Sequence, residues 1–508
     1  MNGMKRTLRS LGALACSAMC LAAVGQEKKE VLPLGTYVPP LGTKTLYQPG
    51  NDTDAPAPAR YTPFFINYVG RHGARHATGD GEFLRLQRCL QEAADAGALE
   101  RDGIRLQRMI AAIAAVERKY PAGTLTAIGE SEQYTIGKDM GDRYPDVVRR
   151  PEDCLEIVTT PELRTVQSAE QFLKGLASSS GCITHSSNDS IRLRFFSLSP
   201  AYTAFVKKGD WHKAQEQLES SPLYQKVDET ILHRLFTGAW VSKLEQGQVD
   251  GFARPDAFIM AVYSAAVIAP GLRQELLALG YRPEDADIFS LLTGQEAAEL
   301  GLIDAAKDFF VKGPGLDSMG IQTRVAAPLL ADFIQSADRW LAAGHKGADL
   351  RFAHAETIAP IAALMGCEGA ATASVDPLQY GRVWHADRVM GYSANIQWIF
   401  YRRNPGETVA SGAVRANGAV HASGPVHASG PVHASGTVRS GSSMQLDDDG
   451  DEPLVKVLYN ERPVRLPIPT EQFPYYSWKK LREYYLHKLH TLDLAPGQDM
   501  YAWLQQLR

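Results

Sequence analysis

The chain has 508 residues, of which 44% are hydrophobic and 22% are charged. Because this length exceeds that of one typical domain, we expect two domains or one large domain with an insertion. The formal net charge is only −4, so composition gives no support for a nucleic-acid-binding protein. Any anion-binding site must therefore be a local cluster of cations.

The first residues have the features of an export signal. Three cations form a positive start: Lys5, Arg6 and Arg9. The apolar stretch Leu11–Val24 follows and is too short to span a bilayer, and small residues suit cleavage after Gly25. We expect residues 1–25 to be a signal peptide and the protein to be periplasmic or secreted. Lipid attachment at Cys16 or Cys20 is the less favoured alternative, and no later segment has a transmembrane pattern.

Removal of the signal peptide leaves four cysteines in an oxidising compartment: Cys89, Cys154, Cys182 and Cys367. Four cysteines allow three pairings, and the sequence does not choose among them. Cys154 and Cys182 are closest in sequence, which is weak evidence for a bond. Buried free thiols are an equal alternative.

The elements of the first part of the chain follow from composition and periodicity. Residues 26–60 are polar and rich in proline, which predicts an extended lead-in. The apolar run Phe64–Val69 predicts a buried strand, because it is rich in aromatic and β-branched residues. Apolar residues at helical spacing predict helices over about 83–94 and 106–116, and a further helix is expected to end near Tyr144.

A second strand is predicted over Leu155–Thr160, and it runs into a helix that starts near Pro161. Ile191–Phe196 alternates apolar and polar residues, which predicts another strand. Residues 200–345 lack good strand signals and contain a series of helical patterns. We therefore expect an α-helical insertion there.

Strand character returns in the last part of the chain, at Asp349–Ala353, and a helix is expected from about Thr357. Asn395–Tyr401 and Leu454–Tyr459 predict two late strands, and Lys479–Leu489 predicts a helix near the C-terminus. Strands at both ends of the chain, separated by a long helical region, indicate a sheet assembled from distant segments.

These elements predict an α/β fold with a large domain, in which helices flank a central mixed sheet, and a smaller inserted domain that is mostly α-helical. The large domain would combine residues 61–199 with residues 346–508. The inserted domain would comprise residues 200–345.

A short repeat interrupts the second part of the large domain at about 408–450. Val420–Pro425 recurs with a period of six, so that His421, His427 and His433 are equally spaced. Glycine, proline, serine and alanine dominate and cannot build a core. We interpret the segment as a flexible loop, with a histidine-bearing metal-binding tract as the less favoured alternative.

The residues that follow the first strand carry the strongest chemical signal. Arg71 and Arg75 present planar forks of donors that match phosphate oxygens. His72 lies between them and should be neutral, because like charge disfavours its protonation. A neutral imidazole beside a phosphate clamp is a nucleophile facing phosphorus. Gly70 and Gly73 would let the backbone approach the ligand closely.

Two alternatives apply to this segment on its own. His72 and His76 are four residues apart and could bind zinc, but a glycine separates them and no acid occurs before Asp80. The stretch Arg71–Gly73 could also be a solvated turn without function. Two distant motifs argue against both alternatives.

Three separated segments together resemble one known family. Arg71-His72-Gly73-Ala74-Arg75 resembles the RHGxR motif of the histidine phosphatases. Arg164-Thr165 with Ser168-Ala169, preceded by Leu125-Thr126 and Gly129, resembles the second arginine region of the acid-phosphatase branch. His354-Ala355-Glu356 is similar to the HAE motif of the multiple inositol polyphosphate phosphatases, which act as phytases. Ala77 stands where many relatives have proline.

The resemblance implies a role for each matching residue. His72 would attack phosphorus and form a phosphohistidine, and Glu356 would protonate the leaving alcohol. Four residues would hold the phosphate oxygens: Arg71, Arg75, Arg164 and His354. Thr78 matches a threonine that contacts substrate in related phytases. No metal or organic cofactor is implied, because arginines supply the positive charge.

The resemblance therefore implies an exported phosphomonoesterase acting on inositol hexakisphosphate and lower inositol polyphosphates. The partner would be this small phosphorylated substrate, without nucleic acid, and the oligomeric state is not predicted. The alternatives are a broad acid phosphatase or sugar-phosphate phosphatase of the same fold and, less favoured, a non-catalytic phosphate-binding protein. Intact His72 and Glu356 argue against the last, because pure binding needs neither nucleophile nor proton donor.

Overall fold

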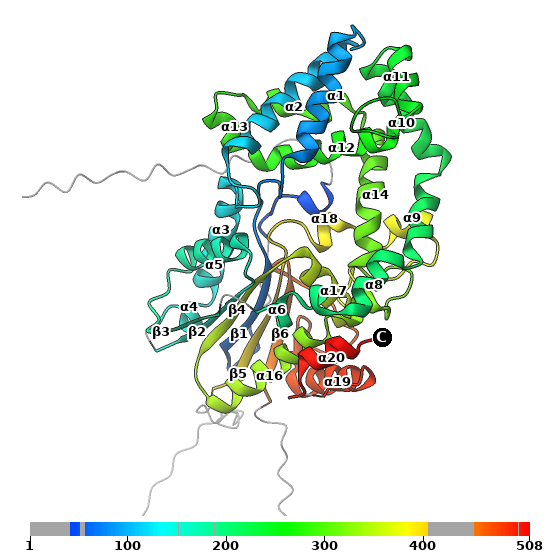
Figure 1. Ribbon diagram of the computed structural model, residues 1–508. Coiled ribbons are helices and arrows are strands. Elements are labelled where there is room, and N and C mark those ends of the chain that lie inside the picture. The colour runs from blue at the N-terminus through cyan, green and yellow to red at the C-terminus, as the bar shows by residue number, and fades with distance from the viewer. Residues whose placement is uncertain (1–40, 51–55, 151, 187–188, 405–451, 496) are drawn as a thin grey trace, which may run out of the picture. The chain divides into compact units, whose positions relative to one another are not determined.

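The computed structural model describes residues 41–50, 56–150, 152–186, 189–404, 452–495 and 497–508 (Figure 1). Every described residue belongs to one compact unit, Pro39–Arg508. The expected signal peptide, the two cysteines considered for lipid attachment and the repeat within 408–450 lie outside the described residues.

An eight-stranded mixed sheet has the order β3-β2-β4-β1-β5-β6-β7, with β8 paired to β6. The strands are β1 (Tyr61–Arg71), β2 (Cys154–Thr159), β3 (Cys182–Ser186), β4 (Gly347–Ala353), β5 (Asn395–Arg403), β6 (Leu454–Tyr459), β7 (Arg462–Pro463) and β8 (Tyr475–Ser477). Strands β1 to β4 are parallel, whereas β5 runs antiparallel to β1. The predicted α/β class with a central mixed sheet is therefore confirmed.

The described helices are α1 (Gly81–Asp95), α2 (Arg101–Lys119), α3 (Ala127–Arg143), α4 (Pro145–Val148), α5 (Leu163–Leu176), α6 (Ser190–Leu193), α7 (Phe195–Leu198), α8 (Pro200–Lys208), α9 (Trp211–Glu219), α10 (Pro222–Leu235), α11 (Gly238–Glu245), α12 (Pro255–Ile268), α13 (Arg273–Ala278), α14 (Gly294–Val311), α15 (Ile321–Arg324), α16 (Ala327–Ala343), α17 (Ala355–Met365), α18 (Ala386–Val389), α19 (Trp478–Thr491) and α20 (Met500–Gln506). Short 3-10 helices lie at Gly42–Lys44, Ala269–Leu272, Pro283–Ala286, Ile288–Leu291 and Pro377–Arg382.

Strand β1 lies at the centre of the sheet and is buried on both faces. Its residues from Phe64 onward are all buried, which explains the continuous apolar run in the sequence. On one face, the ring of Phe65 stacks on Trp340 of α16, with centroids 5.1 Å apart. On the other face, the rings of Tyr68 and Phe172 of α5 have centroids 5.2 Å apart. Helices thus cover both faces of the strand that precedes the predicted phosphate-binding motif.

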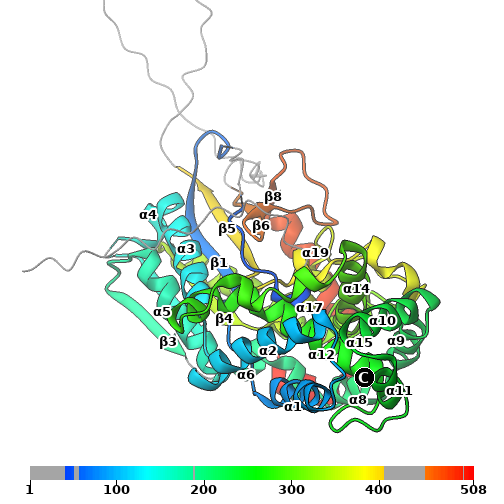
Figure 2. The ribbon, with the colours of Figure 1, turned by 90° about the horizontal axis from the view of Figure 1, so that it is seen from above.

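The segment 200–345 is helical in its described residues, as expected. Helices α1 and α2, which precede it, pack with α10 and α12 at the same end of the sheet (Figures 1 and 2). A backbone bridge between Leu99 and Phe236 joins the two groups. The predicted domain borders, at residues 200 and 345, stay a prediction.

The predicted strand over Ile191–Phe196 is wrong, because the chain forms the short helices α6 and α7 there. The side chain of Asp189 accepts a hydrogen bond from the backbone N–H of Arg192, which starts a helical turn. Leu193 and Phe195 are both buried, so the alternation in the sequence reflected burial but not strand geometry. Strand β3 was not predicted, since it is a short, exposed and partly polar edge strand.

One described segment, Pro255–Ala278, is long and apolar enough to cross a membrane by length and composition alone. In its most apolar 18-residue stretch, 67% is buried inside the protein, which is typical of a core helix. Its apolar character is therefore explained by packing.

Candidate active site

Three parallel strand ends meet at one edge of the sheet and carry the site. Strand β4 lies between β1 and β2, and the register pairs Arg71 with Ala353. The next residues along these strands are His72, His354 and Thr160. The backbone N–H of His72 donates to the carbonyl of Ala353 (3.0 Å), and the rings of His72 and His354 have centroids 5.7 Å apart. The sheet thus brings together two motifs that lie almost 300 residues apart in sequence.

His72 presents an unprotonated ring nitrogen to the site. Its Nδ1 lies 2.9 Å from the carbonyl oxygen of Gly73, and a carbonyl only accepts, so Nδ1 carries the proton and Nε2 keeps its lone pair. Burial, together with Arg71 and the other nearby cations, lowers the pKa of His72 well below its ordinary value. The residue is therefore a neutral nucleophile at mildly acidic pH.

The loop after β1 is fixed by α3 and α5, the two helices that carry residues of the second arginine region. Glu132 of α3 accepts from the backbone N–H of Ala74 (2.8 Å), and Ser168 of α5 accepts from that of Gly73 (3.2 Å). A Cβ at Gly73 would lie 2.4 Å from the carbonyl oxygen of Gly129, at the start of α3. Only glycine fits there, because backbone faces backbone.

Arg71 is locked in place before any ligand binds. Its Nη1 donates to the carbonyl oxygens of Thr43, at 2.5 Å, and of Met390. Its guanidinium lies 4.7 Å from the ring centroid of Tyr392, a cation–π contact. These contacts leave the rest of the guanidinium for a ligand.

The arginines that were predicted to bind phosphate retain unused donors. Within the described residues, the buried Nε–H groups of Arg71, Arg75 and Arg164 have no hydrogen-bond acceptor. Buried donors without acceptors are costly, and an anion with several oxygens would satisfy them. The pKa values of Arg71 and Arg164 are lowered by burial, but arginines stay charged under working conditions.

His354 is held between an arginine and a threonine. Arg164 Nη2 lies 3.4 Å from His354 Nδ1, and Thr160 Oγ1 lies 3.0 Å from His354 Nε2. Burial and then Arg164 lower the pKa of His354 to about 3, so this imidazole is also neutral in the free protein. The edge of the Phe196 ring packs against it, which keeps the ring in this orientation.

Glu356 lies in the first turn of α17 and pairs with a cation that sequence reasoning missed. Its Oε1 lies 3.0 Å from Nζ of Lys312, which also contacts Asp308 at 2.8 Å. Burial raises the pKa of Glu356, but Lys312 outweighs this, and the net pKa lies well below the usual range. The side chain remains 35% exposed, so water reaches the carboxylate.

Thr78 is exposed and lies at the edge of the cluster, near Arg164. A Cβ atom added to Gly123 would lie 3.7 Å from Cγ2 of Thr78 and 3.9 Å from Nη1 of Arg164. The methyl group of Thr78 and the guanidinium of Arg164 thus both lie close to Gly123. The contact of Thr78 with substrate stays a prediction.

Two further site residues had no signal in the sequence. Lys44 lies in the segment interpreted as a lead-in, yet Arg71 and Arg75 both act on its pKa through their charge. Glu162 bridges Arg164 and Arg194, with both distances 2.9 Å. Lysine and glutamate are common in this sequence and neither belongs to a motif. Only the fold shows which charged groups lie beside them.

His76 does not join the cluster. Its Nδ1 lies 3.5 Å from Glu117, and its ring stacks on Tyr120 at 4.9 Å. Within the parts of the chain that the structure describes, no group of three or more His, Cys, Asp or Glu side chains is arranged to hold a metal. His76 is therefore a packed structural histidine.

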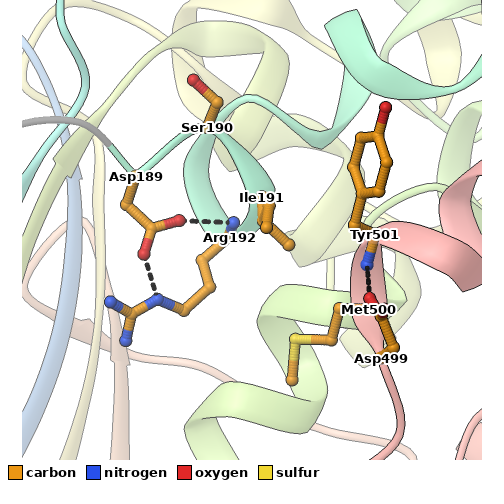
Figure 3. Close-up of a pocket in the computed structure, with 7 residues that line it drawn as sticks. All are labelled: Asp189, Ser190, Ile191, Arg192, Asp499, Met500 and Tyr501. Carbon is orange, nitrogen blue, oxygen red and sulfur yellow. Dashed lines mark hydrogen bonds and ion pairs between the residues drawn. The ribbon is translucent and has the colours of Figure 1, made fainter.

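A cavity of about 340 Å³ lies elsewhere, lined by residues 189–192 and 499–501 (Figure 3). Its one arginine, Arg192, is paired with Asp189 and with Asp332 at 3.1 Å. None of the predicted site residues lines it. Because its positive charge is already neutralised, it is a poor anion site compared with the His72 cluster.

The chain is similar to one known protein family. Residues 65–235 match the family model of the histidine phosphatase superfamily (branch 2). Among curated proteins, none matches the chain. The family match covers the first two of the three motifs and confirms the predicted resemblance.

The fold is similar to solved structures over nearly the whole chain. A multiple inositol polyphosphate phosphatase of Bifidobacterium longum has a TM-score of 0.71 at 21% identity, covering 87% of this chain and 96% of that chain. The phytase of D. castellii has a TM-score of 0.54 at 12% identity, covering 91% and 86%. At these identities the likeness establishes the fold.

Proposed function

We propose that this chain, a branch 2 histidine phosphatase, is an exported phosphomonoesterase that removes phosphate from inositol hexakisphosphate and lower inositol polyphosphates. The observation that carries the proposal is the free Nε2 lone pair of His72, set among arginines whose buried Nε–H groups have no acceptor within the described residues. The related Bifidobacterium longum enzyme has been solved with phosphate and with inositol hexasulfate, which supports a polyanionic substrate here.

In the first step, the Nε2 lone pair of His72 attacks phosphorus. The N–P bond forms as the P–O bond to the alcohol breaks, and Glu356 gives its proton to the leaving oxygen. Arg71, Arg75 and Arg164 stabilise the charge on the three remaining phosphate oxygens. Bound phosphate would also raise the pKa of Glu356, because the negative charge of the phosphate offsets the positive charge of Lys312.

In the second step, water attacks phosphorus on the side opposite His72. The P–N bond breaks, its electron pair returns to Nε2, and the Glu356 carboxylate takes a proton from the water. Phosphate then leaves, so that ester and water have become alcohol and phosphate. Neither step requires a metal or an organic cofactor, because the arginines carry the compensating charge.

His354 would bind a phosphate oxygen by gaining a proton at Nδ1. In the free protein Nδ1 accepts from Arg164. A phosphate dianion would draw the guanidinium to itself and favour the imidazolium, which donates from Nδ1 to phosphate and from Nε2 to Thr160. Thr78, at the rim beside Arg164, would contact the same phosphate or its neighbour on the ring.

Export rests on the N-terminal residues alone. The positive start, the apolar stretch Leu11–Val24 and the small residues before position 26 support a signal peptide and a periplasmic or secreted location.

The test is phosphate release from inositol hexakisphosphate and from glycerol 2-phosphate at pH 4–7 with EDTA present. The wild type should release phosphate from both substrates, with a preference for the first, and His72→Ala should release none. Rapid quenching in alkali should trap an acid-labile phosphoprotein in the wild type only. Activity on glycerol 2-phosphate alone would move the function to a broad acid phosphatase. Inactivity on both substrates would favour a binding protein.

A further inference from the structure

Lys312 connects the end of α14 to the first turn of α17. Its Nζ lies 3.0 Å from Oε1 of Glu356 and 2.8 Å from Oδ1 of Asp308, which lies four residues earlier on the same chain. The three side chains are only 15–35% exposed. Asp308 orients the lysine, and the lysine in turn holds the carboxylate of Glu356.

Within the described part of the chain, other charged groups also influence Glu356 through their charge, but none of them forms an ion pair with it. His354 belongs to the N-terminus of α17, Arg71 to β1, Arg164 to α5 and Tyr202 to α8; each influences Glu356 or is influenced by it through charge. The arginines face the proposed phosphate position, so bound substrate neutralises their effect. Glu356 forms its ion pair with Lys312, which is not among the residues proposed to bind phosphate.

We infer that Lys312 is a positioning residue that holds the Glu356 carboxylate and sets the pH range over which it can donate a proton, and that Asp308 opposes this effect. The inference rests on the proposed function, since it concerns the donor of that reaction. Neither Lys312 nor Asp308 belongs to the motifs that identify the site.

Lys312 can affect the reaction because it influences whether Glu356 is protonated. To act as an acid, Glu356 must carry a proton, which it passes to the leaving alcohol oxygen as the ester P–O bond breaks. An ammonium at 3.0 Å favours the carboxylate and makes the protonated form scarce as pH rises. Lys312 keeps its own proton throughout, because burial is outweighed by its two carboxylate partners and its pKa is raised.

Removal of each partner should therefore move the activity profile in opposite directions. Lys312→Met removes the cation, so Glu356 keeps its proton to higher pH. Asp308→Asn removes a competing anion and leaves the full charge of Lys312 to Glu356, so the proton is lost at lower pH. A general loss of packing would not produce shifts of opposite sign.

The experiment measures kcat/KM against pH with glycerol 2-phosphate, because this ratio reports ionisations of the free enzyme and substrate and this leaving group needs a proton. The pH above which kcat/KM falls should rise by about one to two units in Lys312→Met and fall by up to about one unit in Asp308→Asn. On the falling limb, each unit is a tenfold change at fixed pH. Lys312→Arg should restore the profile of the wild type.

A matched control and a second substrate complete the test. Lys307→Met removes the same charge from an exposed position on α14 and should leave the profile unchanged. With p-nitrophenyl phosphate, whose leaving group needs little protonation, the shifts should shrink. Shifts of the same sign, or no shift, would overturn the inference. An inactive wild type would instead refute the proposed function.

Discussion

Arg164 Nη2 lies 3.4 Å from Nδ1 of His354, and an arginine can only donate in this contact. The proton of the neutral imidazole is therefore on Nε2, which donates to Thr160 Oγ1 at 3.0 Å. Thr160 can donate onward to Thr165 Oγ1 (3.0 Å), whose hydroxyl bonds the carbonyl of Glu162 at 2.8 Å. A chain of hydroxyls behind the site thus fixes the orientation of His354 through an acceptor that works in both of its protonation states.

Thr160→Val should weaken phosphate binding and catalysis without removing any group that touches substrate. Valine matches the shape of threonine but leaves the Nε2–H of His354 without its acceptor, at a cost of about one hydrogen bond to a buried group. We expect a fall in kcat/KM of about tenfold, and Thr160→Ser should recover most of it. Steady-state kinetics and inhibition by inorganic phosphate measure both variants. Equal activity of the valine variant and the wild type would contradict the role of these hydrogen-bonded hydroxyls in orienting His354.

Gly73→Ala should destabilise the protein and abolish activity. The new methyl group would meet the carbonyl oxygen of Gly129 at 2.4 Å, and the start of α3 would have to move away from the His72 loop. We expect a loss of about 1–3 kcal/mol of unfolding free energy, measured by denaturant titration. Gly79→Ala is the control, because nothing lies within 4 Å of its new methyl group. Similar stability of both variants would show that the loop adapts.

The sequence carried enough information for the sheet and for the central part of the site. Phe64–Val69 is an apolar run and Asp349–Ala353 has strand character; both are buried in the sheet, and polar residues follow each of them closely. The resemblance to the histidine phosphatases placed His72 and His354 in one site. The structure pairs β1 with β4 in parallel, so the residues that follow these strands lie at the same edge of the sheet.

The sequence could not reveal residues whose role depends on tertiary packing alone. Lys312 ends a helix, and no local pattern indicates that its ammonium reaches Glu356. Lys44 lies in a polar segment whose backbone is tied down by Arg71, through the carbonyl of Thr43. The strand predicted over Ile191–Phe196 was wrong for a related reason. Two buried positions two residues apart fit a strand and a pair of short helices equally well.

Activity should persist well below pH 6.5, the ordinary pKa of histidine. The pKa of His72 is lowered well below that value by burial and then by Arg71, so its neutral form prevails above the lowered pKa and is lost only as pH falls through it. The acidic limb of kcat/KM, after correction for ionisation of the substrate, should therefore lie below pH 6.5. An acidic limb centred at or above pH 6.5 would mean that the site does not suppress protonation of His72.

Lys44→Met should weaken phosphate binding below about pH 8 and remove a pH dependence near that value. Burial lowers the pKa of Lys44 to about 8, with Asp304 opposing and Arg71 and Arg75 adding to the effect. The ammonium is charged below that pH and neutral above it, so inhibition by inorganic phosphate should weaken as pH rises through 8. Lys44→Arg stays charged and should bind phosphate equally on both sides of pH 8. Unchanged inhibition of the methionine variant would place Lys44 outside the site.

Cys154 and Cys182 should form a disulfide bond under oxidising conditions. The two residues are register partners on the adjacent parallel strands β2 and β3. Neighbouring strands are about 4.8 Å apart, which lies within the Cα separation that a disulfide spans. Both thiols are free in the structure, and their mutual hydrogen bond, with burial, raises the pKa of Cys154 to about 11. Because the thiolate is the reactive form, oxidation should be slow at neutral pH and faster in alkali.

Oxidised glutathione should take two electrons and two protons from the thiol pair, forming one intramolecular bond and two molecules of reduced glutathione. Intact-mass measurement should show the loss of two hydrogen atoms, which Cys154→Ser abolishes. Closing a loop of roughly 30 residues should raise the free energy of unfolding by about 3 kcal/mol, so the melting temperature should fall when a reductant is added. Cys89 and Cys367 are buried and should remain reduced on this timescale. A glutathione adduct on exposed Cys182, without the internal bond, would show that the strand geometry does not permit closure.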